Sequence, residues 1–212
     1  MVVSVILGIY LLNGLIIFLA WNMFLATLVY TLGTLLAFLI KTKSKLWIIL
    51  VVTAVWILFF PNSIYMLTDF IHFQNYTFFL EYSDIYNYSL AEWLVFGHVT
   101  IGALYAAKLG IASIQKIEPH INKYFTGIYP LALTFLFFLS SFGIFIGRFL
   151  RFNSWDIFGL ITQIGMVFSH GTFLVGFIVI FIILHWVVYF LFSNDKSKID
   201  DIDSKNILEE KI

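Results

Sequence analysis

Long apolar runs separated by short polar breaks dominate the pattern of residues along the chain. The first charged residue is Lys41, and forty uncharged residues in one helix would extend about 60 Å, twice the hydrocarbon thickness of a bilayer. We therefore predict two spans with a turn at Trp21-Asn22, because tryptophan favours the interface and asparagine tolerates turn geometry. Later breaks, such as Pro61-Asn62, separate further spans. The predicted spans are residues 2–19, 23–40, 46–60, 92–112 and 125–146, and one within 157–192.

The last apolar stretch is broken at Ser169-His170-Gly171. We expect its first part, residues 157–168, to be an interfacial or re-entrant piece before a single span; the alternative is two short spans. Residues 1–193 then form the membrane bundle. Residues 194–212 alternate charged residues and serine, and we expect them to form a charged cytoplasmic tail.

The composition agrees with a membrane protein. Hydrophobic residues make up 61% of the 212 residues and charged residues 11%, whereas a soluble protein has roughly 45–50% and about 25%. Because a soluble fold has no place to bury this much apolar surface, we expect an all-α, polytopic transmembrane bundle of about six spans, with short interfacial helices on the outer side. The composition of a membrane protein excludes a nucleic-acid binder, which needs a basic face. The absence of cysteine excludes disulfides and thiolate metal sites.

The basic residues predict the orientation, because cytoplasmic loops carry an excess of Lys and Arg. The stretch 61–91 contains neither and is expected outside, so both termini are expected on the cytoplasmic face of a plasma membrane. Only Arg148 and Arg151 remain on the outer side. The other ten basic residues face the cytoplasm: Lys41, Lys43, Lys45, Lys108, Lys116, Lys123 and the four lysines of the tail.

Small residues recur at helical spacing in the fourth predicted span. Gly102, Ala106 and Gly110 are four residues apart and predict one face of the helix that allows close packing against a neighbour. Ordinary bundle packing explains this pattern without any further function.

The segment PNSIYMLTDFIH, residues 61–72, holds the first group of candidate site residues. Proline ends the preceding span and a short new helix follows, on which Tyr65, Asp69 and His72 share one face at i, i+4 and i+7. A carboxylate and an imidazole one turn apart can share a proton, hold a metal or orient a nucleophile. An interfacial helix whose polar face meets water and headgroups explains the same pattern equally well.

The segment GRFLRFNSWD, residues 147–156, holds the second group. Arg148 and Arg151 are one turn apart and can bind one phosphate together, or extend to lipid phosphates as anchors. Asn153 and Asp156 have the spacing of a helix N-terminal cap. An ion pair of Arg148 with Asp69, or of Arg151 with Asp156, is a further alternative.

The remaining histidines give weaker signals. His98 lies inside a predicted span, where an ionisable group suggests a function, although a hydrogen-bonded packing role explains it as well. His170 lies at the break before the last span, and His185 beside Trp186 suggests an aromatic belt. Metal binding by His72, His98 and His170 is open, but no dense metal motif supports it, and no metal or cofactor is assigned.

Three runs of residues resemble one family. FPNSIYMLTDFIHF is similar to the family's FPNAPYxxTDxxHL stretch, GRFLRFNSWD to GRFxRWNSWD, and WNMFLA at residues 21–26 to WNLFLA. The family is an uncharacterised bacterial one known as domain of unknown function 1361, and this chain has Ser63-Ile64 in place of its usual Ala-Pro pair. The resemblance implies a multi-pass bacterial plasma-membrane protein and implies no activity.

Three functions therefore stay open, and the sequence does not decide whether the protein is an enzyme. The first is a non-enzymatic accessory or assembly protein, in which the polar segments tie helices together or dock another membrane protein. The second binds or modifies a phosphate-bearing lipid, with Arg148 and Arg151 on the phosphate and Asp69 with His72 as acid/base or metal pair. The third is a small transporter with a proton path through Asp69, His72 and His98. Proximity of Arg148 to Asp69 is required for any shared site.

Overall fold

The computed structural model describes residues 2–10, 14–80, 84–125, 127–151, 165, 169 and 171–193. In this part of the chain the secondary structure is helical apart from one isolated antiparallel bridge, Phe79 to Tyr86. The elements are α1 (Val2–Tyr10), α2 (Gly14–Lys41), α3 (Leu46–Phe59), α4 (Pro61–Tyr65), the 3-10 helix η1 (Met66–Asn75), α5 (Leu90–Phe125), α6 (Tyr129–Phe145), the π-helical turn η2 (Ile146–Leu150) and α9 (Gly171–Phe192).

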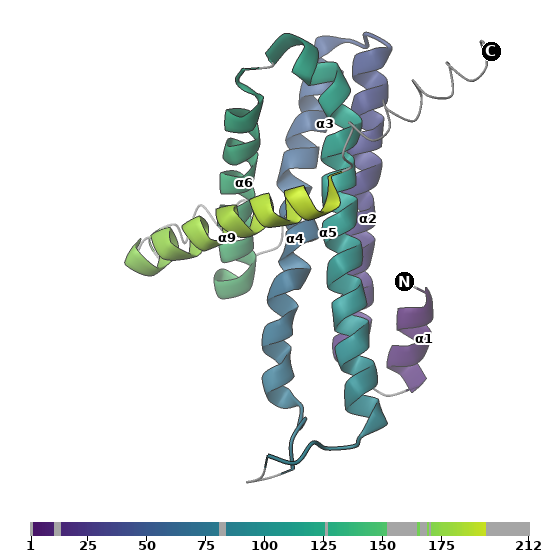
Figure 1. The fold of residues 1–212 in the computed structure, drawn as a ribbon. Helices are drawn as coiled ribbons and strands as arrows, with labels where there is room; N and C mark the ends of the chain where they lie inside the picture. Colours follow the sequence, from purple (N-terminus) through teal and green to yellow (C-terminus); the bar gives the residue numbers. More distant parts are fainter. Residues whose placement is uncertain are drawn as a thin grey trace, which may run out of the picture.

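The expected all-α, polytopic bundle is confirmed. Among the described residues, five helices are long and apolar enough to cross a membrane. Four of them, with their continuations, run side by side in Figure 1, whereas α9 crosses them steeply. The five are Gly14–Lys41, Leu46–Asn75, Leu90–Ile121, Tyr129–Leu150 and Gly171–Phe192.

The predicted turn at Trp21-Asn22 is wrong. Both residues lie inside α2, which continues without a break for 28 residues. The Asn22 side chain finds a partner within the bundle, so it does not need a turn at the membrane surface. The break comes earlier, and α1, at nine residues, extends about 14 Å, which is too short to cross a bilayer.

The structure ends α3 at Phe59 and begins the short helix α4 at Pro61, as predicted, but the span does not end there, because α3, α4 and η1 together form one apolar helical segment from Leu46 to Asn75. Pro61 cannot donate to the Ile57 carbonyl four residues earlier, yet the helical path continues past it, and side chains bind two of the next carbonyls. Asn62 Nδ2 donates to the Phe59 carbonyl at 2.8 Å, and Ser63 Oγ donates to the Phe60 carbonyl at 2.7 Å. Asp69 and His72 therefore lie on a membrane-length helix, not on a separate short helix of an outer loop.

The fourth span is longer than predicted. The polar connector expected at residues 113–123 is helical and belongs to α5, which has 36 residues and contains Pro119. The fifth span agrees better, since α6 and η2 together cover Tyr129–Leu150. The helix ends at Arg151, whose φ of 59° lies in the left-handed region. The uncertain segment 157–168 lies outside the described residues, apart from Gly165.

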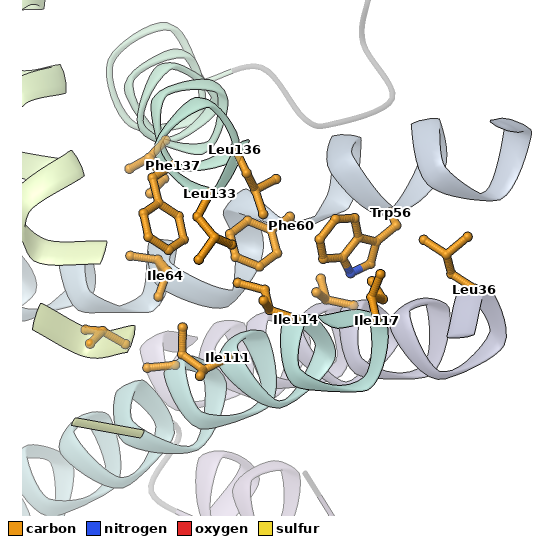
Figure 2. Close-up of a cluster of buried hydrophobic side chains, with 14 residues drawn as sticks. Leu36, Trp56, Phe60, Ile64, Ile111, Ile114, Ile117, Leu133, Leu136 and Phe137 are labelled. Carbon is orange, nitrogen blue, oxygen red and sulfur yellow. The ribbon is translucent and has the colours of Figure 1, made fainter. Parts of the chain in front are cut away.

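Aromatic and aliphatic side chains fill the interior between α3, α4, α5 and α6. Figure 2 shows Phe60 and Ile64 facing Ile111 from one side and Phe137 from the other. Glycine permits the close approach: a Cβ added at Gly110 would lie 2.6 Å from the Ser63 Cβ. The predicted small-residue face of α5 therefore packs against the helix that carries the candidate site.

Candidate functional site

A buried polar network joins three separate helical segments. Asn22 comes from α2, Asp69 from η1 and Arg148 from η2, and Thr68 and His72 flank Asp69 on η1. In a 3-10 helix, residues three apart lie one above the other, so Asp69 and His72 share a face. The structure thus brings the first predicted group and Arg148 of the second into contact.

Asp69 is the centre of the network, and its side chain is 0% exposed. Its Oδ1 lies 2.5 Å from Arg148 Nη2. Its Oδ2 accepts a hydrogen bond from Asn22 Nδ2 at 3.1 Å. Each carboxylate oxygen therefore has a donor, and the one carrying most of the electrostatic stabilisation is the guanidinium.

Arg148 uses all three of its nitrogens inside the protein. Nε donates to Thr68 Oγ1 at 2.8 Å, and Nη2 donates to the same hydroxyl and to Asp69. Nη1 lies 3.4 Å from His72 Nε2, and the guanidinium carbon lies 4.4 Å from the centre of the Tyr65 ring. The cation is thus neutralised by a carboxylate and covered by an aromatic face, which favours its retention in an apolar interior.

His72 lies at the edge of the network, with a side chain 33% exposed. A guanidinium can only donate hydrogen bonds, so in a hydrogen bond with Arg148 Nη1 the His72 Nε2 would be the acceptor. His72 Nε2 is also 3.9 Å from Asp69 Oδ1. Tyr65, Thr68 and Arg148 are also partly exposed, so the network meets its surroundings through these side chains as well as through His72.

The network lies well inside the bundle. A Cβ added at Gly102 of α5 would lie 2.8 Å from the Met66 side chain, which places Met66, one turn before Asp69, level with Gly102. Gly102 follows Leu90, the start of α5, by twelve residues, or about 18 Å of helix. At such a position the loss of either charge leaves the other without water to solvate it.

Of the other predicted site residues, the structure describes Arg151 and His98, and neither makes a hydrogen bond or ion pair with a described member of this network. Arg151 is exposed and, within the described part of the chain, has no ion-pair partner. His98 lies on α5, and its buried Nε2 has no hydrogen-bond partner among the residues that the structure describes. The structure describes no group of three or more His, Cys, Asp or Glu residues that could hold a metal ion. Three predicted residues lie outside the described part of the chain: Asn153, Asp156 and His170.

Two members of the network were missed from the sequence. Asn22 was interpreted as a turn residue, although an amide in a long apolar run is costly unless it has a partner. Thr68 was not among the predicted site residues, yet its hydroxyl both accepts from Arg148 and donates to the Tyr65 carbonyl at 2.6 Å. In the sequence, Asn22 is an isolated amide within an apolar run, which indicates that it needs a polar partner. The sequence does not show that this partner is Asp69.

The assignment of His185 to an aromatic belt is wrong. Its side chain is fully buried between the rings of Phe60 and Phe137. Nε2 lies 2.8 Å from Ser140 Oγ on α6, and Nδ1 lies 2.6 Å from the Phe181 carbonyl one turn earlier on α9. His185 therefore attaches α9 to the bundle.

Fold and site together define a multi-pass helical membrane protein whose spanning segments are joined by a buried arginine–aspartate pair. The chain belongs to the family described as protein of unknown function DUF1361, whose model matches residues 21–188. The resemblance carried by the three sequence motifs is thereby confirmed. No curated protein and no solved structure matches the chain.

Proposed function

We propose that this protein is a non-enzymatic accessory or assembly protein of the plasma membrane, in which the Asn22–Asp69–Arg148 network is a structural tie. The observation that carries the proposal is that the charged atoms of Asp69 and Arg148 already have partners within the protein. Both oxygens of Asp69 and all three nitrogens of Arg148 bind groups of the chain itself. Each charged atom of the pair thus already has a partner within the described part of the chain, which leaves little capacity to bind a substrate.

The same observation argues against acid/base chemistry by Asp69. A general base must come within hydrogen-bond reach of the proton that it removes, directly or through one water. The Asp69 side chain is 0% exposed and its oxygens are already occupied. A reaction at this carboxylate would first require the ion pair to open, at the energetic cost of two buried charges.

A tie of this kind fixes how helices pack. Burying an ion pair is often no more stabilising than burying apolar side chains of similar volume, but an incorrectly packed bundle would leave both charges unpaired. We infer that the network selects one arrangement of α2, η1 and α6. A fixed arrangement of helices is what an assembly protein needs in order to present a constant surface to its partner.

The lysines support an orientation for this proposal. The loop with Lys41, Lys43 and Lys45 lies at the same end of the bundle as the connection between α5 and α6, and we propose that this end faces the cytoplasm (Figure 1). The cytoplasmic N-terminus expected earlier depended on a span over residues 2–19. Because α1 is too short to return across the bilayer, the start of α2 is placed on the outer side in this proposal.

A direct test compares lipid binding and complex formation. Native mass spectrometry of the wild type and of the double variant Asp69→Leu/Arg148→Met is expected to show the same bound lipids. A stoichiometric phosphate-bearing lipid lost in the double variant would contradict the structural role. In native gels of mildly solubilised membranes, the wild type is expected in a complex larger than one chain. A lone chain there would contradict the assembly role.

A second candidate function rests on Arg151. Its exposed side chain lies three residues after Arg148 and has no ion-pair partner among the described residues, so it supports binding of a phosphate-bearing lipid headgroup. Arg151→Gln serves as the matched variant, since it removes an exposed charge and leaves the network intact. Loss of one specific lipid in Arg151→Gln alone would favour this candidate.

A further inference from the structure

A short hairpin rich in aromatic residues connects η1 to α5. We use the name aromatic hairpin for residues 76–80 and 84–89. Its two sides pair through the bridge between Phe79 and Tyr86, with hydrogen bonds from Leu80 N to the Ile85 carbonyl and from Asn87 N to the Phe78 carbonyl, both 2.8 Å. In Figure 1 this connection lies at the end of the bundle opposite to the lysine-rich loop.

The hairpin is fastened to the first turn of α5. Glu92 accepts hydrogen bonds from Thr77 N and from Asn87 Nδ2, each at 3.3 Å, and Trp93 Nε1 donates to the Asn87 carbonyl at 3.3 Å. The Phe78 ring lies 5.6 Å from the Trp93 ring. These contacts give the hairpin a defined position relative to the spanning helices.

The hairpin and Leu90, the residue that follows it, expose large apolar side chains next to the exposed Asp84. Tyr88 is 90% exposed, Leu90 73% and Ile85 58%. In water, an apolar patch of this kind marks a surface that binds something. Tyrosine and tryptophan are the residues enriched where a membrane meets water, because each combines an apolar ring with a polar group.

We propose that the aromatic hairpin lies in the interface of the lipid bilayer, with Ile85, Tyr88 and Leu90 among headgroups and the first carbons of the acyl chains. The exposed apolar surface continues from the hairpin onto α5 through Leu94 (44% exposed) and Ile101 (66% exposed), which faces lipid if α5 spans the membrane. No Lys or Arg occurs between Lys45 and Lys108, so within this stretch of the chain aromatic rings, and not basic side chains, are available for headgroup contact.

This placement has a consequence for the charged network. With Leu90 at the boundary, Gly102 and the neighbouring Met66 lie about 18 Å deeper along α5. Asp69 and Arg148 then lie at the level of the acyl chains, where an unpaired charge is most costly.

Site-directed spin labelling tests the proposal, and the cysteine-free sequence makes each introduced cysteine unique. The full-length variants Ile85→Cys and Tyr88→Cys would be labelled with a nitroxide and reconstituted in vesicles of phosphatidylcholine and phosphatidylglycerol. Collision rates with oxygen, which concentrates in lipid, and with a nickel chelate, which stays in water, report the surroundings of each label. Ile101→Cys gives the reference for lipid, and Lys45→Cys, at an exposed position in the opposite loop, gives the reference for water.

The proposal predicts an oxygen-to-nickel collision ratio at positions 85 and 88 several-fold above that at 45 and approaching that at 101. Ratios equal to that at 45 would overturn it, because the hairpin would then lie in water. Labels that are immobilised and protected from both reagents would also overturn it, because a protein surface, such as a second copy of the chain, would then cover the hairpin.

Discussion

At the scale of single residues, the account depends on one buried carboxylate and its partners. Asp69 is held by Arg148 on one oxygen and by Asn22 on the other. Water cannot replace either partner at a side chain that is 0% exposed. The loss of unfolding free energy caused by a substitution here is therefore set by the buried polar or charged group that is left without a partner, and not by the contact that is removed.

Replacing Asp69 by asparagine is expected to lower the free energy of unfolding by about 3–5 kcal/mol, because the Arg148 charge stays buried without its counterion. Unfolding by denaturant in detergent micelles measures the change. Asp84→Asn is the control, since Asp84 is exposed and its substitution is expected to have little effect. Equal stability of the two variants would contradict the central place of Asp69.

Replacing Asn22 by alanine is expected to cost about 1–3 kcal/mol, the penalty for one buried acceptor left without a donor. The same unfolding measurement applies. Trp21→Ala, at an exposed position one residue earlier on α2, is the matched control and is expected to change stability less. A larger loss at Trp21 than at Asn22 would indicate that the amide does not support the network.

At the scale of elements, close packing of α5 against the segment from α3 to η1 positions the network. The Met66 side chain packs at Gly102 and the Ser63 side chain packs at Gly110. The segment from α3 to η1 therefore approaches α5 closely at both glycines. The close approach depends on the absence of a Cβ at these two positions. Helix packing and the ion pair therefore support each other.

Gly110→Ala is expected to destabilise the protein by about 1–3 kcal/mol, because the new Cβ would lie 2.6 Å from the Ser63 Cβ. Gly97→Ala on the same helix is the control, since nothing lies within 4 Å of its Cβ position and alanine favours a helix. Thermal unfolding of the two variants compares them. Destabilisation by Gly97→Ala but not by Gly110→Ala would contradict the packing described.

Sequence patterns predicted the helical bundle and part of the site, for physical reasons that differ between residues. Asp69, His72 and Arg148 stood out because charged or titratable groups are rare between apolar runs. Asn22 and Pro61 misled because the usual rules treat asparagine and proline as signs of a turn or an end, whereas here other side chains satisfy the polar groups. Which polar residue pairs with which depends on tertiary packing, and a single sequence does not contain that information.

At the scale of the whole molecule, α9 joins the bundle at a steep angle and is fixed by a polar contact of its own (Figure 1). His185 reaches Ser140 of α6 between two aromatic rings. In the described part of the chain, one buried polar connection thus joins α2, η1 and η2 and another joins α6 and α9, while Trp56 Nε1 donates to Ser113 Oγ at 3.2 Å between α3 and α5.

Ser140→Ala is expected to lower stability by about 1–3 kcal/mol, because His185 Nε2 is left without its partner in a fully buried position. Thr31→Ala is the control, since Thr31 is exposed and its hydroxyl bonds its own helix. Urea unfolding in mild detergent distinguishes the two. An unchanged midpoint for Ser140→Ala would show that this contact does not hold α9.

The central claim is that Asp69 and Arg148 act together as a structural tie, and a double-mutant cycle tests it most directly. The unfolding free energies of the wild type, Asp69→Leu, Arg148→Met and the double variant would be measured under one condition. We expect each single variant to lose about 3–5 kcal/mol and the double variant to lose much less, with a coupling energy of about 3 kcal/mol. Losses that add to within about 0.5 kcal/mol would show that the two residues act independently and would contradict the account.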